Sequence, residues 1–589
     1  MNMKDVAVGK SDFKEMITGN YYYVDKSLFI KDVIDRGDAV ILLPRPRRFG
    51  KTLNMTMLGY FYDCCPEKVP RDSEGRYPTN KNDLPKNSYK QLFERLLIHT
   101  AGQKYLDKMG KHPVIFLTFK TLKERDWNVC YDKLKQLISD AYTKHMYLLS
   151  SMELLPHEKD YFKRIIDVSA SIGDYENSLE KLMIFLSRYY DERAVILIDE
   201  YDAPIHAGFN KDYYEDIIEF MRNFLGGALK DTGKYLEKGV LTGVMRIARE
   251  SIFSGLNNPG VYTLLSEKFD DKFGFTEREM ETILKDFNLL DQYEAVQQWY
   301  NGYTFGRETI YNPWSIISFL ANDGKEFSPY WINTSSNDII EFLLSKGGKE
   351  LKEELEQLIR GESIEKVIDE NIVFKDIYNR EDLLWSFLLM AGYLKQSNPR
   401  QKEGITVNTY YTLSIPNKEV REAYTLIVQN YFSNKIGSKE LEIMLKALMD
   451  GHITIFEEIF SQYVASAMSV FDTAGDAEKV YHAFVMGLLL WVSPAYQVKS
   501  NRESGYGRYD IMIIPNDPSK LGYIIEFKKV RKNETVKLAI ESALKQIEEK
   551  KYETDLIEKG ITNIKKLAIV FKGKDVYVKE KGGADRPVK

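Results

Sequence analysis

The stretch AVILLPRPRRFGKT, residues 39–52, places a phosphate-type loop directly after an apolar run. The run at 39–44 predicts a buried strand. Gly50, Lys51 and Thr52 match the end of a P-loop, in which backbone N–H groups surround phosphates, the lysine reaches the outer ones and the hydroxyl ligates Mg²⁺. Arg45 stands where such a loop normally has its first glycine. The loop must therefore reach its shape without the positive φ that glycine allows there.

A second stretch supports a phosphate site. AVILIDE, residues 194–200, is an apolar run that ends in two carboxylates. This arrangement predicts that Asp199 holds Mg²⁺ and that Glu200 orients the attacking water. Thr242, within the apolar run VLTGVM, is a candidate sensor of the γ-phosphate. Each feature taken alone also fits a structural role: a basic surface turn, a solvated acidic turn and a core hydroxyl.

Apolar runs alternate with helical patterns over the first 275 residues. Strands that alternate with helices predict a parallel sheet covered on both faces. The polar tract 66–88, rich in Pro, Asn and Gly, predicts an exposed insertion. The other expected strands are 113–119, 194–198 and 240–245, and the expected helices are 51–62, 177–190 and 213–229.

The pattern changes twice farther along the chain. It becomes mainly helical from about residue 276, and after about residue 470 strands and helices alternate again, with strands expected at 507–514, 521–528 and 566–572 and a helix at 533–552. A chain of 589 residues is too long for one core. We therefore expect an α/β multidomain protein: a P-loop domain over 1–275, a helical region over 276–470 and a small α/β domain over 471–589.

The C-terminal α/β domain contains a candidate metal site. The two-residue period of strand 521–528 places Glu526 and Lys528 on one face. A short hairpin can bring Asp510 beside Glu526 around one ion. Two carboxylates suit Mg²⁺ or Mn²⁺, and a neighbouring lysine can activate water and stabilise charge on a phosphate. The arrangement predicts phosphodiester hydrolysis, and a charge pair on an edge strand is the structural alternative.

Composition excludes several other classes of protein. With 44% hydrophobic and 29% charged residues the chain should be folded. Its three cysteines and seven histidines show no zinc-site or disulfide spacing. The N-terminus does not resemble a signal peptide, and no apolar run approaches the roughly 20 residues of a membrane span. We therefore expect a cytoplasmic protein with no membrane partner. The net charge is −5, but basic residues are in excess after residue 470, which favours that region for a polyanion.

Longer strings resemble bacterial AAA-ATPase-like proteins that carry a C-terminal nuclease-type domain. In that family an arginine-rich loop with a single glycine replaces the ordinary P-loop. The resemblance implies ATP binding, and leaves turnover open. The strings are RPRRFGKT at 45–52, IDEYDAPI at 198–205, TGVMRIARESIFSGLNN at 242–258, FGFTERE at 273–279 and NGYTFGRETIYNPWS at 301–315. The expected ATP- and Mg²⁺-binding residues are Arg45, Arg47, Arg48, Phe49, Gly50, Lys51, Thr52, Asp199 and Thr242, with Thr52 and Asp199 on the metal.

The pattern D-x15-E-x-K, formed by Asp510, Glu526 and Lys528, resembles the PD-(D/E)xK nuclease superfamily. Tyr509 replaces the proline that usually precedes the aspartate. The resemblance implies a nucleic-acid substrate, with DNA favoured, and Asp510 and Glu526 as metal ligands. It adds Gln546 to the catalytic set, because this residue is similar to the glutamine of the QxxxY element of RecB-type nucleases.

Two further residues fit this resemblance less closely. Tyr552 follows Gln546 at a longer spacing than QxxxY, and Glu478 stands on the preceding predicted helix, where the superfamily often has another acidic ligand. Two hypotheses follow. The chain is an ATP-binding protein whose nucleotide state controls a Mg²⁺-dependent nuclease, or a nucleotide-dependent scaffold or signalling switch whose nuclease-like domain binds without cutting. The sequence leaves oligomerisation open.

Overall fold

The chain divides into two compact units in its computed structural model. The first unit comprises Met1–Asn333 and Glu365–Val420, and the second comprises Thr334–Ile364 and Arg421–Lys589. The structure describes residues 4–85, 89–230, 233–246, 259–331, 340, 349–359, 361–371, 377, 380–402, 408–436, 438–467, 495–500, 503–504, 507–508, 510–530, 534–572 and 575–582. The predicted three-part division of the chain stays a prediction.

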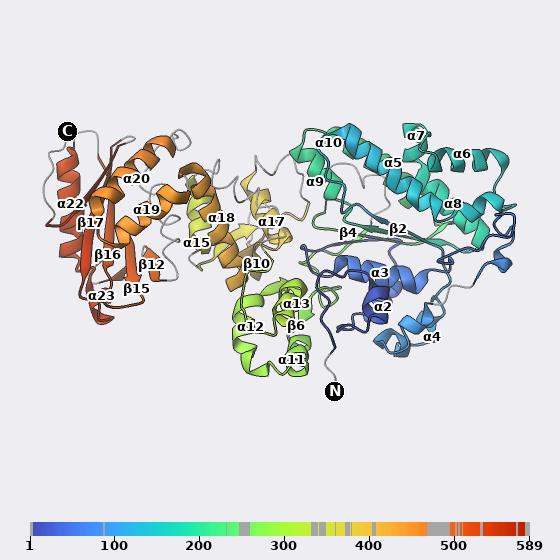
Figure 1. Ribbon diagram of the computed structural model, residues 1–589, viewed down its shortest axis with the longest axis horizontal. Helices are drawn as coiled ribbons and strands as arrows, with labels where there is room; N and C mark the ends of the chain where they lie inside the picture. Colours follow the sequence, from blue (N-terminus) through green and yellow to red (C-terminus); the bar gives the residue numbers. More distant parts are fainter. Residues whose placement is uncertain are drawn as a thin grey trace. The chain divides into compact units, whose positions relative to one another are not determined.

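A five-stranded parallel sheet forms the centre of the first unit (Figure 1). Its spatial order is β2–β3–β4–β1–β5, so β4 separates the strand that precedes the loop from the strand that carries the acidic pair. The C-terminal ends of these strands meet at one edge of the sheet, where ligands of parallel sheets bind. The strands are β1 (Val40–Pro44), β2 (Val114–Thr118), β3 (Ala194–Asp199), β4 (Leu236–Gly243) and β5 (Gly260–Val261).

Helices cover both faces of this sheet (Figure 1), as expected for strands that consist mainly of buried apolar residues. On one side lies α3 (Lys51–Tyr62), and on the other lie α5 (Trp127–Thr143), α8 (Ser178–Tyr190) and α10 (Tyr214–Leu229). The predicted α/β class is therefore confirmed. Residues 66–83 are mostly exposed and contain no strand, in keeping with the predicted insertion.

The region that follows the sheet is mainly helical, and it contains two small sheets that periodicity did not indicate. Four of their strands have two to four residues, too few for a period to be recognised, and the two longer ones, 395–402 and 408–414, contain no apolar run. The first sheet has the order β6–β8–β7 (Phe275–Thr276, Glu308–Tyr311, Tyr303–Phe305) and lies beside α11 (Glu277–Asp286), α12 (Tyr293–Tyr300) and α13 (Pro313–Ala321). The second has the order β10–β11–β9 (Lys395–Lys402, Asn408–Ser414, Ile364–Val367); β9 precedes α17 (Glu381–Ala391) in the chain, and β10 and β11 follow it.

The second unit is built on a mixed sheet in the order β12–β15–β16–β17–β18. β16 and β17 are parallel and the other neighbours are antiparallel. The predicted strand 507–514 is divided at Asp510 into β14 (Gly507–Arg508) and β15. The strands of the sheet are β12 (Tyr496–Ser500), β15 (Ile511–Pro515), β16 (Gly522–Lys529), β17 (Ile564–Lys572) and β18 (Asp575–Glu580).

Alternate residues of these strands form separate cores on the two faces of the mixed sheet, which follows from the two-residue period. Ile511 and Ile525 pack with α19 (Ser438–Met449) and α20 (Ile453–Ala467). Met512 and Ile524 pack with α22 (Val536–Glu549) and α23 (Thr554–Glu558). Glu526 belongs to the second set by its parity, so it faces α22. Among the residues that the structure describes, the unit also contains α15 (Lys349–Ile359) and α18 (Lys418–Ile436), the latter starting in the first unit. In the part of the chain that the structure describes, no helix has the length and apolarity needed to cross a bilayer.

Candidate functional site

The phosphate-type loop joins the end of β1 to the start of α3. Gly50 precedes α3 with φ 83°, in the left-handed region that glycine adopts at little cost. Arg48 has φ 71°, whereas Arg45 does not adopt a positive φ. The glycine missing from position 45 is therefore not required by the backbone of this loop.

Three predicted residues from three elements meet at the carboxylate of Asp199. The Thr52 hydroxyl donates to Asp199 Oδ2 at 2.8 Å, and the Thr242 hydroxyl donates to Asp199 Oδ1 at 2.8 Å. Asp199 is fully buried, and burial together with the charge of Glu200 raises its pKa, although the two hydroxyls act in the opposite direction. The position of β4 between β1 and β3 brings the three side chains together.

Lys51 lies between the loop and the second carboxylate of the acidic pair. Its Nζ lies 3.2 Å from Glu200 Oε1 and donates to the carbonyls of Arg45 and Pro46 at 3.1 Å each. Burial by itself raises the pKa of Glu200, but the charges of Lys51, Arg47 and Lys123 outweigh it and lower this pKa overall. Glu200 is therefore held as an anion beside the lysine.

Two residues of this site were missed by the sequence analysis. The carboxylate of Asp202 accepts the backbone N–H of Val244 at 2.8 Å and of Met245 at 2.9 Å. Its burial, with the charge of Glu200, raises its pKa to about 6. Lys123, exposed beyond β2, has its pKa lowered by partial desolvation and by the charge of Arg47, and the charges of Glu200 and Asp202 act in the opposite direction. The string IDEYD could have indicated Asp202 as a third carboxylate, but no local pattern marks Lys123.

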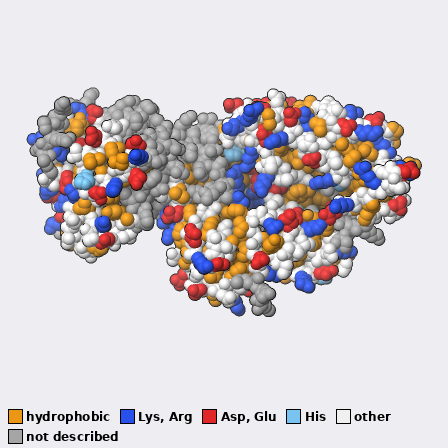
Figure 2. All heavy atoms as spheres, in the orientation of Figure 1, with side chains coloured by type: hydrophobic (Ala, Val, Ile, Leu, Met, Phe, Trp, Pro, Cys, Tyr) orange, Lys and Arg blue, Asp and Glu red, His pale blue; other side chains and the backbone are white. Residues whose placement is uncertain are grey.

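The side chains of the loop face in different directions. Arg47 is partly exposed, and its charge affects the pKa values of Glu200 and Lys123. Arg45 and Phe49 are fully buried, and the guanidinium of Arg48 lies 3.8 Å from the ring centroid of Trp314. Arg45 and Phe49 therefore support the loop from inside the protein. The set of loop side chains that could touch a nucleotide is smaller than the sequence predicted. Figure 2 shows lysine and arginine side chains gathered on the surface near α9 (Ala203–Asn210), the helix that follows the acidic pair.

The predicted carboxylates of the second unit occupy facing positions on neighbouring strands. Ile511 of β15 pairs with Ile525 of β16, so Asp510 lies opposite Glu526 in the same register. Asp510 Oδ2 accepts the backbone N–H of Phe527 at 2.8 Å. Lys528 Nζ lies 3.3 Å from Glu526 Oε1, as the shared face predicts. Glu526 is 1% exposed, so these side chains take the place of water around its carboxylate.

Gln546 of α22 completes this group. Its amide donates to Glu526 Oε1, and the same Nε2 lies 3.3 Å from the hydroxyl of Tyr552. Burial raises the pKa of Tyr552, and the charges of Glu526 and Asp510 add to this effect. Tyr552 therefore joins the group despite its longer spacing, because the chain turns back after the end of α22.

The described residues contain no cluster of three or more His, Cys, Asp and Glu side chains that could hold a metal ion. Asp510 and Glu526 are two such ligands. Glu478 and Tyr509 lie outside the described residues.

Two family models match separate parts of the chain. The model of a family described as "Predicted AAA-ATPase" matches residues 7–72 and 80–253. The model of the PD-(D/E)XK nuclease superfamily matches residues 476–581. The chain joins an AAA-ATPase-like region to a PD-(D/E)XK nuclease-like region. The AAA-ATPase-like match omits residues 73–79, which lie within the exposed insertion, and the nuclease-like match includes Asp510, Glu526, Lys528 and Gln546.

One curated relative is similar along most of the chain. It is described as "Uncharacterized protein in vnfD 5'region" of Azotobacter chroococcum mcd 1, and it is 26% identical over 424 residues. The similarity covers 72% of this chain and 69% of the relative, so it extends beyond the AAA-ATPase-like region. No solved structure matches the chain.

Proposed function

We propose that the AAA-ATPase-like region binds ATP with Mg²⁺ and hydrolyses it. The observation that carries the proposal is the meeting of Thr52, Thr242 and Asp199, with Lys51 beside Glu200. These are the residue types that P-loop proteins use to hold Mg²⁺, to bind the outer phosphates and to orient water.

The residues present fit a magnesium ion. A hydroxyl and a carboxylate oxygen 2.8 Å apart, those of Thr52 and Asp199, are hard oxygen ligands of the kind that Mg²⁺ prefers. When bound, Mg²⁺ would supply positive charge that neutralises the phosphate oxygens. Lys51 would add a second positive charge at the outer phosphates, and Glu200, kept ionised by its basic neighbours, would accept a proton from the attacking water.

The first test is nucleotide binding measured by calorimetry with wild type and Lys51→Ala. Loss of the ammonium should raise the Kd for ATP at least a hundredfold. Lys104→Ala is a matched control, because its side chain is 68% exposed and pairs with Asp35. Equal affinity in wild type and Lys51→Ala would reject the assignment of the site.

The second test separates binding from turnover. Glu200→Gln keeps the shape of the side chain but cannot accept a proton, so ATP should stay bound while turnover falls by about two orders of magnitude. Phosphate release measured under single-turnover conditions reports the difference. If the wild type releases no phosphate with or without nucleic acid, hydrolysis is rejected and a binding role is retained.

We also propose that the nuclease-like region cleaves nucleic acid, with DNA as the favoured substrate. The proposal rests on Asp510 opposite Glu526, with Lys528 and Gln546 in contact with Glu526. The two carboxylates are suitable ligands for Mg²⁺ or Mn²⁺, which when bound would polarise water and phosphate oxygens. Lys528 would stabilise negative charge on the phosphate, and Gln546 holds Glu526 in orientation.

The test is cleavage of single- and double-stranded DNA and RNA with Mg²⁺ or Mn²⁺ by wild type, Asp510→Ala and Lys528→Ala. Both variants should lose cleavage at least a hundredfold. Lys545→Ala, on the exposed side of α22 with its side chain 73% exposed, is the control. Intact substrates under every condition would favour the scaffold or switch, in which the region binds without cutting.

We propose, finally, that the nucleotide state controls the nuclease-like region. P-loop proteins order nearby segments through the γ-phosphate and release them after hydrolysis, which supplies the two states that control requires. Cleavage should therefore differ between ATP and ADP in the wild type and be insensitive to nucleotide in Lys51→Ala. Identical cleavage by the wild type with ATP, with ADP and without nucleotide would reject this control while leaving both activities intact.

A further inference from the structure

A segment remote in sequence passes beside the phosphate-type loop and is bonded to it along its length. We call this segment, residues 269–276, the strap. Arg45 Nη2 donates to the carbonyl of Phe269 at 3.1 Å, and Asn54 of α3 donates to the carbonyl of Lys272 at 2.8 Å. The N–H of Gly274 donates to the carbonyl of Phe49 at 3.2 Å. The strap thus contacts the loop at its start, at its end and in the first turn of the following helix.

Arg45 fixes the start of the loop from inside the protein. Besides Phe269, its guanidinium donates to the carbonyls of Pro44 and Tyr262 at 2.7 Å each. It also lies 5.2 Å from the ring centroid of Phe273 in the strap. A planar guanidinium can donate several hydrogen bonds in a fixed geometry, which lysine cannot do. Arg45 therefore joins three chain segments at the position where a P-loop normally has a flexible glycine.

Phe49 fixes the end of the loop. Its ring is fully buried, with centroids 4.9 Å from Tyr303 and 5.1 Å from Phe305. Gly274 passes this ring closely, at φ 85°. A Cβ on Gly274 would lie 2.2 Å from Cγ2 of Ile310 and 3.1 Å from Cδ1 of Phe49. Only glycine fits here, at a positive φ and between Ile310 on one side and the Phe49 ring of the loop on the other.

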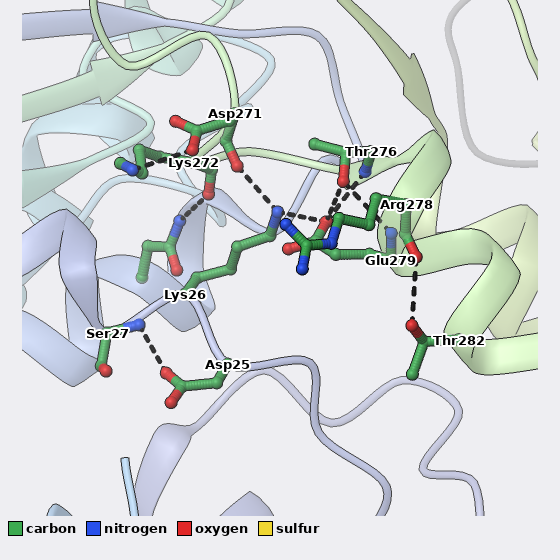
Figure 3. A network of polar contacts seen from close by, with 10 residues as sticks. Asp25, Lys26, Ser27, Asp271, Lys272, Thr276, Arg278, Glu279 and Thr282 are labelled. Carbon is green, nitrogen blue, oxygen red and sulfur yellow. Dashed lines mark hydrogen bonds and ion pairs between the residues drawn. The ribbon is translucent and has the colours of Figure 1, made fainter. Parts of the chain in front are cut away.

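The strap is also held on the side that faces away from the loop (Figure 3). The ammonium of Lys26 donates to the carbonyl of Asp271 at 2.7 Å and pairs with Glu279 Oε2 at 2.6 Å. Glu279 also accepts the N–H of Thr276 at 2.8 Å, which closes the capping box of α11. The strap is thus held between the loop on one side and the N-terminal segment with α11 on the other.

We propose that the strap sets the shape of the phosphate-binding loop, and that Arg45 and Phe49 are positioning residues for the bound nucleotide. Side-chain anchors at both ends of the loop replace the conformational freedom of the missing glycine. They also hold Arg48 between them at a positive φ, which a non-glycine residue does not adopt without support. The strap lies between the two stretches that the family models match, so neither match includes it.

The anchoring is tested first without any nucleotide, by hydrogen exchange of the backbone amides in peptides covering 44–54. Arg45→Ala and Gly274→Ala should each speed exchange of the loop at least tenfold and leave β3 unchanged. Arg125→Ala is the control, because this side chain is 85% exposed and pairs with Asp126. Unchanged exchange of the loop in both variants would overturn the proposal. Phe49→Leu, which keeps apolar bulk, is added for the case in which a variant does not fold.

The positioning role rests on the proposed ATP site and is tested by nucleotide affinity. Arg45→Ala and Phe49→Ala should weaken ATP binding at least tenfold, and Phe49→Leu should recover most of the loss. If a variant shows faster hydrogen exchange in the loop but binds ATP with wild-type affinity, the proposal that Arg45 and Phe49 position the nucleotide is rejected. If the wild type does not bind ATP, the proposed function fails, whereas the exchange experiment still decides whether the strap orders the loop.

Discussion

Glu419 is a buried carboxyl group outside both candidate sites. Its oxygens accept the hydroxyl of Ser315 at 2.8 Å and the backbone N–H of Trp331 at 2.9 Å. Burial outweighs these hydrogen bonds and raises the pKa of Glu419 to about 7. A raised pKa means that the folded state binds the proton more tightly than the unfolded state. Its contribution to stability is therefore complete below the ordinary pKa of glutamate and is lost as pH rises through 7.

Glu419→Gln should remove this pH dependence from the first unit. The shift from 4.5 to about 7 corresponds to at most about 3 kcal/mol between low and neutral pH. Thermal unfolding of wild type and variant from pH 5 to pH 8 measures it, with exposed Glu94→Gln as control. The curve of the variant should be flatter than that of the wild type. Parallel curves would show that Glu419 titrates normally.

Tyr552 provides a residue-scale test of the second site. Its hydroxyl contacts the same amide nitrogen of Gln546 that donates to Glu526. Tyr552→Phe should destabilise the second unit by about 1 kcal/mol, the usual net value of one hydrogen bond. Gln546→Glu should cost more, because it places a second carboxylate against Glu526 in a buried setting. Urea unfolding measures the loss of stability in each variant. A smaller loss in Gln546→Glu than in Tyr552→Phe would show that the contact of Gln546 with Glu526 does not stabilise the unit.

The sequence was informative for residues whose neighbours follow from strand order. These residues lie at or after the C-terminal ends of parallel strands, so the sequence was enough to expect that they are close together. They are Lys51, Thr52, Asp199 and Glu200. The roles of Arg45 and Phe49 could not be expected, because their partners lie more than two hundred residues away and no local pattern marks them. Lys123 was missed because no local pattern marks it.

At the scale of elements, the end of β4 depends on the turn after β3. Asp202 accepts the N–H groups of Val244 and Met245, the first residues beyond β4. Asp202→Ala leaves two buried donors without this acceptor, at a cost of about 1–3 kcal/mol for each. Asp202→Asn keeps an acceptor oxygen and should cost less. Thermal unfolding of both variants checks this, and equal losses would mean that the carboxylate does not hold the end of β4.

Sequence periodicity predicted the long and fully apolar elements best. The helix α3 has the bounds that were expected, and β2 and β3 differ from their predicted ranges by a residue or two. The start of β4 was missed because Leu236–Gly239 includes Glu237 and Lys238, which interrupt the apolar run. β12, β18 and the two small sheets were missed because their strands are short or rich in polar residues, so they contain no continuous apolar run.

At the scale of the whole molecule, the two compact units imply two unfolding transitions. A ligand that binds one folded unit stabilises that unit alone, by about 2.7 kcal/mol at a concentration a hundredfold above its Kd. ATP with Mg²⁺ should therefore raise the midpoint temperature of one of the two calorimetric unfolding transitions and leave that of the other unchanged. Lys51→Ala should abolish the shift. A single transition, or a shift of both, would show that the units unfold together.

The strap also has a consequence for the order of synthesis. The loop leaves the ribosome 224 residues ahead of the carbonyl of Phe269 that Arg45 requires. At about 5–20 residues per second this interval lasts on the order of ten seconds or more. During that time the nascent chain carries the P-loop sequence without the partners that shape it. Competence to bind nucleotide should then be acquired only after residue 276 has emerged, so a shorter nascent chain would not sequester ATP.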